Sequence, residues 1–252
     1  MKYYYSIFIM SLFLSGCYFD SSDDQLLAND VRLYRHTPVW DMAKSIKEDD
    51  TSSLRSLLTN APGSILNYQE KRFGQTLINW AVYTDHYPSV KLLAELGADP
   101  NIQEKNGTSA FINAAYKFET SDYLKLLLKY GGNINAVANI DTPQYIRTPL
   151  IAACLTRLES VQLLLNAGAD LNYINADYQS PLSATLAFKK LDITKYLIED
   201  KKVNYKIVIG VTSDGVPITF QDELSSYNFS PGSDDDNLKT EILNYIHSKE
   251  KK

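Results

Sequence analysis

The amino-acid sequence predicts an all-α repeat solenoid with about five helical units and a C-terminal capping unit. Two observations carry this prediction: a period of about 34 residues, and the same order of helix-starting and helix-ending residues in each period. An asparagine marks the period at Asn67, Asn101, Asn135, Asn172 and Asn204. One unit of this size cannot bury its apolar face alone, so neighbouring units must stack.

The first helix of each unit is expected to begin at a threonine or serine. These steps are Thr37-Pro38, Thr76-Leu77, Ser109-Ala110, Thr148-Pro149 and Ser180-Pro181. A side-chain hydroxyl can accept a hydrogen bond from a free N–H of the first turn, and proline fits that turn. Alanine pairs at 114–115 and 152–153 allow close packing of the first helices.

The second helix of each unit is expected to contain a leucine run and to end at a glycine. The runs at 92–93, 126–128 and 163–165 precede the triplets Gly97-Ala98-Asp99, Gly131-Gly132-Asn133 and Gly168-Ala169-Asp170. Glycine ends a helix because the position after it needs a left-handed backbone. The Asp and Asn residues then favour a turn into the next unit.

These segments resemble the ankyrin repeat. The resemblance rests on 74–82 (GQTLINWAV), 107–115 (GTSAFINAA), 148–154 (TPLIAAC) and 177–184 (DYQSPLSA). It implies paired antiparallel helices joined by β-turn or hairpin fingers, with a concave face that binds proteins. The histidine of the family pattern is replaced at every unit, by Trp40, Asn79, Ile112, Ile151 and Ser183. We therefore expect the hydrogen bonds of that histidine to be lost or replaced.

The chain is expected to divide into four parts. They are a signal peptide at 1–16, an acidic tether at 17–30, an ankyrin-repeat domain at 31–204 and a degenerate C-terminal capping repeat with an insert at 205–252. In the last part, an insert is expected at 225–236 and a helix over about 237–249. The fifth unit departs from the pattern, because Lys201-Lys202 stands where Gly and a small residue are expected.

The N-terminal segment resembles that of a bacterial lipoprotein. A short apolar stretch ends in Leu14-Ser15-Gly16-Cys17, which resembles the lipobox. The resemblance implies cleavage before Cys17 and acylation of its sulfur and amine, with a lipid anchor in the membrane. Tyr18 after the cysteine implies the outer membrane, facing the periplasm; the acidic run that follows leaves surface export open. A plain secretory peptide or a buried N-terminal helix are the alternatives.

Composition and motifs argue against an enzyme. The net charge of −5 disfavours a nucleic-acid partner, and two Cys and three His leave little for a disulfide scaffold or a metal cluster. The sequence has no nucleophile elbow, phosphate loop, dinucleotide fingerprint or zinc-ligand spacing. We expect no cofactor, no metal and no small-molecule substrate.

Isolated reactive side chains have ordinary explanations. Cys154 is expected to be a buried, inert thiol, and His86 to lie on the surface between paired helices. The run Asp234-Asp235-Asp236 is expected to be solvated rather than to bind a cation. Trp40 and Trp80 are expected to pack between first helices.

The 18 tyrosines suggest a binding surface. Those on helices are expected in the core: Tyr83, Tyr116, Tyr123, Tyr130 and Tyr196. Those in fingers are Tyr68, Tyr145, Tyr173, Tyr178 and Tyr205. Tyrosine is a frequent contact residue in binding loops, although packing between fingers would explain these residues equally well.

The candidate partner-binding residues lie in the fingers. The finger spanning 136–147 is longer than a packed repeat needs, and surplus loops often carry function. The candidates are Tyr68, Tyr145, Arg147, Tyr173, Asp177 and Tyr178.

The sequence predicts a non-enzymatic protein-binding module anchored in the bacterial envelope. It resembles bacterial ankyrin lipoproteins, which include immunity proteins that neutralise type VI secretion phospholipases. That resemblance implies a secreted toxin as partner, and the net acidity fits a basic patch on it. The alternative is a general periplasmic adaptor that assists an envelope stress enzyme or a host-surface interaction.

Overall fold

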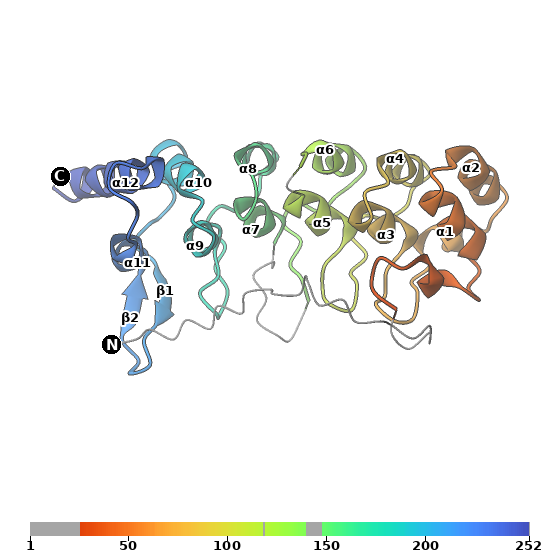
Figure 1. Cartoon of the computed structure of the whole chain (residues 1–252), viewed down its shortest axis with the longest axis horizontal. Coiled ribbons are helices and arrows are strands. Elements are labelled where there is room, and N and C mark those ends of the chain that lie inside the picture. Colours follow the sequence, from red (N-terminus) through yellow and green to blue (C-terminus); the bar gives the residue numbers. More distant parts are fainter. Residues whose placement is uncertain (1–25, 118, 140–147, 252) are drawn as a thin grey trace.

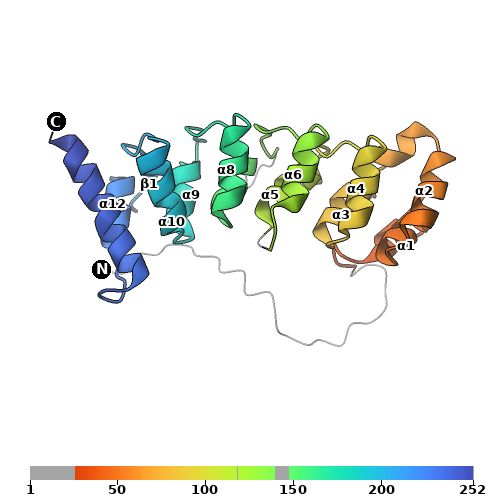
Figure 2. The same cartoon turned by 90° about the horizontal axis from the view of Figure 1, so that it is seen from above.

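The structure is a computed structural model that describes residues 26–117, 119–139 and 148–251. Its helices form six stacked antiparallel pairs, with the fingers along one edge (Figure 1). Seen from above, the pairs follow one another in a single row (Figure 2). The predicted all-α repeat solenoid is confirmed.

The helix pairs follow the chain in order. They are α1 (Trp40–Lys47) with α2 (Thr51–Thr59), α3 (Leu77–Tyr83) with α4 (Tyr87–Glu95), α5 (Ala110–Tyr116) with α6 (Asp122–Lys129), α7 (Pro149–Cys154) with α8 (Leu158–Asn166), α9 (Pro181–Ala187) with α10 (Leu191–Lys195), and α11 (Phe220–Ser226) with α12 (Asp234–Glu250). Short 3-10 helices span Val31–Tyr34 and Gly63–Asn67, and one π-helical turn spans Tyr196–Asp200. We number the pairs as units 1 to 6.

The predicted helix starts are confirmed in units 2 to 5. The side chains of Thr76, Ser109, Thr148 and Ser180 each accept a hydrogen bond from a backbone N–H in the first turn. In unit 1 the helix starts later than Thr37-Pro38, at Trp40, without a side-chain cap.

The predicted glycine ends of the second helices are also confirmed. Gly97, Gly131 and Gly168 have φ values of 93°, 90° and 97°. In unit 5, Lys202 takes this left-handed position with φ of 57°. The π-helical turn before it absorbs one extra residue of the chain.

The periodic asparagines connect successive units. The Oδ1 atoms of Asn67, Asn101 and Asn135 accept hydrogen bonds from the backbone N–H of Asp99, Asn133 and Asp170, at 2.9, 2.7 and 2.9 Å. The family histidine is replaced in unit 2 by Asn79. Its Nδ2 donates to the Ile102 carbonyl at 3.0 Å.

The C-terminal unit is more regular than the sequence predicts. Its finger is an antiparallel hairpin of β1 (Val208–Val211) and β2 (Pro217–Thr219). Thr219 then caps α11 with a capping box. The last helix begins at Asp234 rather than near 237, because Ser233 caps it, and the three aspartates form its first turn. Carboxylates there interact favourably with the helix dipole.

The folded part reaches into the segment predicted as a tether. Leu26 is buried, and the Asp30 side chain caps the 3-10 helix at Val31–Tyr34 by accepting from the Arg32 N–H. Tyr34 is fully buried, and its hydroxyl donates to the Thr76 carbonyl at 3.1 Å. In the described part of the chain, none of the helices combines the length and apolar character that a membrane span requires.

Candidate protein-interaction surface

The fingers of units 2 to 4 are joined by a row of side-chain amides. Gln69 Nε2 donates to the Gln103 carbonyl at 2.9 Å, and Gln103 Nε2 donates to the Val137 carbonyl at 2.8 Å. The Asn139 N–H donates in turn to Gln103 Oε1 at 3.0 Å. These bonds fix the relative position of adjacent fingers, so the fingers form one continuous edge (Figure 1).

The row changes from polar to apolar along the array. The second residue after each periodic asparagine is Gln69, Gln103, Val137 and then Ile174. Val137 and Ile174 are 45% and 47% exposed, and Tyr178 on the same finger as Ile174 is 37% exposed. We call Val137, Ile174 and Tyr178 the apolar finger patch. Exposed apolar residues grouped in this way are typical of a protein-interaction site.

Tyr178 is held in an unfavourable backbone conformation. Its φ is 61°, whereas the equivalent position, two residues before the helix-capping Thr or Ser, is Gly74 in unit 2 and Gly107 in unit 3, with φ of 74° and 80°. A non-glycine residue in the left-handed region costs on the order of 1 kcal/mol. Part of the Tyr178 side chain stays open to a partner, because it is 37% exposed.

The candidate residues from the sequence fall into three groups. Tyr178 and Asp177 are exposed on the finger of unit 5. Tyr68 and Tyr173 are half-buried and pack against the core. Cys17, Tyr145 and Arg147 lie outside the described residues.

Sequence reasoning missed Val137 and Ile174. Their common register with Gln69 and Gln103 was available, because all four follow a periodic asparagine by two residues.

One helical tyrosine was placed wrongly. Tyr83 was expected in the core but is 52% exposed, because it is the last residue of α3 and lines an open hollow with Leu27 and Arg32. Tyr123 is buried, and the other helical tyrosines are half-buried against the core: Tyr116, Tyr130 and Tyr196.

Tyr34, in the 3-10 helix before unit 1, packs against unit 2. Tyr34 packs edge-on against Trp80, with ring centroids 5.7 Å apart, so Trp80 is a core residue as predicted. His86 is more buried than expected: it stacks on Trp80, and its Nδ1 lies 2.8 Å from Asp49 Oδ1. Nothing in this arrangement presents a nucleophile to the imidazole.

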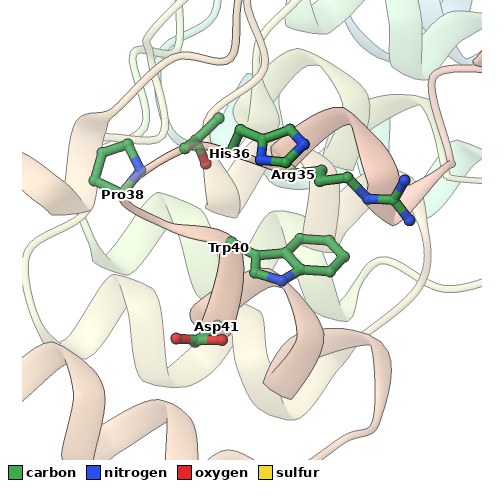
Figure 3. Close-up of a pocket in the computed structure, with 6 residues that line it drawn as sticks. Arg35, His36, Pro38, Trp40 and Asp41 are labelled. Carbon is green, nitrogen blue, oxygen red and sulfur yellow. The ribbon is translucent and has the colours of Figure 1, made fainter. Parts of the chain in front are cut away.

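A second hollow of about 440 Å³ lies at the start of unit 1 (Figure 3). Its lining comes from one stretch of chain, residues 35–41, and Arg35, His36, Pro38 and Asp41 are exposed. Trp40 is half-buried below them, with Lys44 Nζ 5.4 Å from its ring centroid. Exposed side chains from a single loop do not form an enclosed site.

Cys154 is fully buried, and burial raises the pKa of its thiol far above the usual range, so the thiol is inert as predicted. Among the described residues, no group of three His, Cys, Asp or Glu side chains could hold a metal ion.

Comparison with known proteins agrees with the repeat architecture. The family model for ankyrin repeats matches residues 41–138 and 78–175, which together cover more than half of the chain. Protein PhlB of Serratia liquefaciens is 42% identical over 38% of this chain and 40% of its own length. The fowlpox virus protein FPV031 is 29% identical over 66% of this chain and 46% of its own length. The chain thus spans less than half the length of these relatives.

Proposed function

Because the chain belongs to the ankyrin-repeat family, we propose that it is a non-enzymatic protein-binding module held at the bacterial envelope, with a partner that docks on the apolar finger patch. The observation that carries this proposal is Tyr178. It is an exposed aromatic residue that occupies a position where two other fingers have glycine. Ile174 on the same finger and Val137 on the adjacent finger are exposed apolar residues as well.

The distribution of charge supports a partner with a basic surface. Residues 205–252 carry eight acidic residues and five lysines. The described residues between 26 and 204 carry 18 of each sign. The excess of negative charge therefore lies in the C-terminal unit and in the N-terminal segment. The acidic residues of that segment are Asp20, Asp23 and Asp24. A partner with an apolar contact and a basic rim would complement the patch and the C-terminal unit next to it.

The partner we propose is a toxin that acts in the periplasm, of the type VI secretion phospholipase class, which the chain would bind and neutralise as an immunity protein. The lipobox-like segment supports this, because an anchor at Cys17 would place the inhibitor at the membrane that such an enzyme attacks. The similarity to a bacterial protein, PhlB of Serratia liquefaciens, is consistent with a bacterial role.

Lipidation is tested separately from partner binding. The wild-type chain should incorporate radiolabelled palmitate and fractionate with membranes, and Cys17→Ser should lose the label and give a soluble or uncleaved form. Equal labelling of both chains would contradict the anchor.

Partner binding is tested by site-specific photo-crosslinking in cells that carry the intact envelope. A benzophenone side chain replaces Tyr178 in one chain and Lys91, exposed on α4, in the control chain. We expect the benzophenone at position 178, but not the one at position 91, to crosslink to a partner protein. That protein should hydrolyse phospholipids, and adding the chain should abolish this activity. Capture of a protein whose hydrolytic activity is absent or unaffected would favour the envelope adaptor instead.

A further inference from the structure

The tips of the fingers in units 2 and 3 carry three exposed cations. They are Lys71, Arg72 and Lys105, which we call the basic finger tips. Lys105 lies against the neighbouring finger: its backbone N–H donates to the Phe73 carbonyl at 2.8 Å, and its Nζ donates to the Lys71 carbonyl. The three charges therefore belong to one continuous surface.

The acidic residues of the same tips point inward. Glu70 is 2% exposed, and its carboxylate accepts hydrogen bonds from the backbone N–H of Arg72, Phe73 and Gln75. Glu104 is buried as well. The outer surface of these two tips is consequently cationic, whereas the finger of unit 5 exposes Asp170 and Asp177, and the finger of unit 6 exposes both Lys206 and Asp214. The sign of the exposed charge thus differs between the fingers of units 2 and 3 and the finger of unit 5.

The cationic end is also the end at which the N-terminal segment joins the array. Leu26 is buried, and Leu27 lines the hollow beside Tyr83. Leu26 lies nine positions after Cys17, and nine fully extended residues span at most about 30 Å. An anchor at Cys17 would keep units 1 to 3 closer to the bilayer than units 5 and 6.

We propose that the basic finger tips dock on anionic phospholipid headgroups and so hold the N-terminal end of the finger edge against the membrane. This inference rests on the lipid anchor of the proposed function. Lysine and arginine side chains near an anionic bilayer are attracted to it within a Debye length. The exposed acids of the unit 5 finger would be repelled, which leaves the apolar finger patch accessible to a partner.

The test measures sedimentation of the full chain with vesicles. One set contains phosphatidylcholine alone and the other contains about 30% phosphatidylglycerol, both in about 0.1 M salt. The test variant is Lys71→Glu with Lys105→Glu. The matched control is Lys91→Glu with Lys129→Glu, which makes the same change in charge on exposed positions of α4 and α6, in the row away from the fingers (Figure 1). The apolar N-terminal segment is common to all chains, so differences between them report on the fingers.

Wild type should bind the anionic vesicles roughly tenfold or more tightly than the neutral ones, with the difference lost at high salt. The finger variant should lose this preference and the control should keep it, with thermal melts showing that all are folded. Equal losses in both variants, or a preference that survives in the finger variant, would overturn the proposal. Crosslinking at Tyr178 can be repeated in detergent, without a bilayer, so failure of membrane docking is distinguishable from failure of partner binding.

Discussion

Gly132 is the residue at which unit 3 departs most clearly from its neighbours. Alanine stands at the equivalent positions, 98 and 169, but a Cβ on Gly132 would lie 2.1 Å from Cδ2 of Phe111. The residues in register with Phe111 are the smaller Ile78 and Leu150. The glycine is therefore required by the phenylalanine ring.

The Gly132→Ala variant should be destabilised by about 1–3 kcal/mol, because the added methyl group overpacks the site. Phe111→Leu in the same chain should recover much of this loss, since it removes the ring that the methyl group meets. Urea unfolding of wild type, the two single variants and the double variant measures the coupling. Additive changes in free energy would show that Phe111 and Gly132 are not coupled.

Glu104 should make stability depend on pH. Its burial raises the pKa of the carboxyl from an ordinary value of 4.5 to about 7. A raised folded-state pKa gives a stability contribution that is complete below pH 4.5 and is lost as the pH rises through 7. The loss amounts to at most about 3 kcal/mol.

Glu104→Gln removes this titration while keeping the shape of the side chain. Its stability relative to wild type should therefore increase between about pH 5 and pH 8. Urea midpoints at several pH values measure the difference. Parallel curves for the two chains would show that Glu104 does not change its protonation in this range.

At the scale of whole elements, the periodic asparagine is the connector between units. Asn101, in the finger of unit 3, is linked to the start of the finger of unit 4 by two bonds: it accepts from the Asn133 N–H at 2.7 Å and donates to the Gly131 carbonyl at 2.9 Å. Asn172 has the same register, but the structure shows no bond from its side chain to the next unit within the described residues. The chain that follows the π-helical turn departs from the repeat pattern at Lys201-Lys202.

Asn101→Ala should accordingly lower the free energy of unfolding by about 1–2 kcal/mol. Asn172→Ala should change it by less than about 0.5 kcal/mol, as is usual for exposed positions. Thermal and urea unfolding of the two variants provide the comparison. A loss as large in Asn172→Ala would mean that the asparagine acts within its own loop rather than between units.

Helix starts and ends could be predicted because they depend on local chemistry. The caps at Thr76 and Ser180 and the glycine at Gly168 are each fixed by a few neighbouring residues. The π-helical turn at Tyr196–Asp200 could not be predicted, because the packing of the next unit determines where one extra residue is absorbed.

The candidate surface was only partly predictable for a related reason. In the sequence, Tyr68 and Tyr178 look alike, because each is a tyrosine in a predicted finger. Only the stacking of the fingers makes Tyr68 pack against the core and leaves Tyr178 exposed. The sequence pattern places a residue in a finger, but it does not determine which side of the finger a neighbour covers.

For the whole molecule, the fold and the proposed binding function make opposite demands on Tyr178. Glycine would suit its φ of 61° better, as Gly74 and Gly107 show at the equivalent turns. An exposed aromatic ring is a frequent energetic centre of an interface. One substitution can therefore separate the two roles.

Tyr178→Gly should leave the array as stable as wild type or stabilise it by up to about 1 kcal/mol, because it relieves the left-handed strain. It should weaken binding of the crosslinked partner by about 2 kcal/mol or more, since it removes the ring that we place at the interface. Calorimetric affinity and a thermal melt are measured on each chain, with Tyr83→Ala as a control at an exposed tyrosine on α3. Unchanged affinity in Tyr178→Gly would move the interface away from the apolar finger patch, and a lowered melting temperature would show that Tyr178 supports the fold instead.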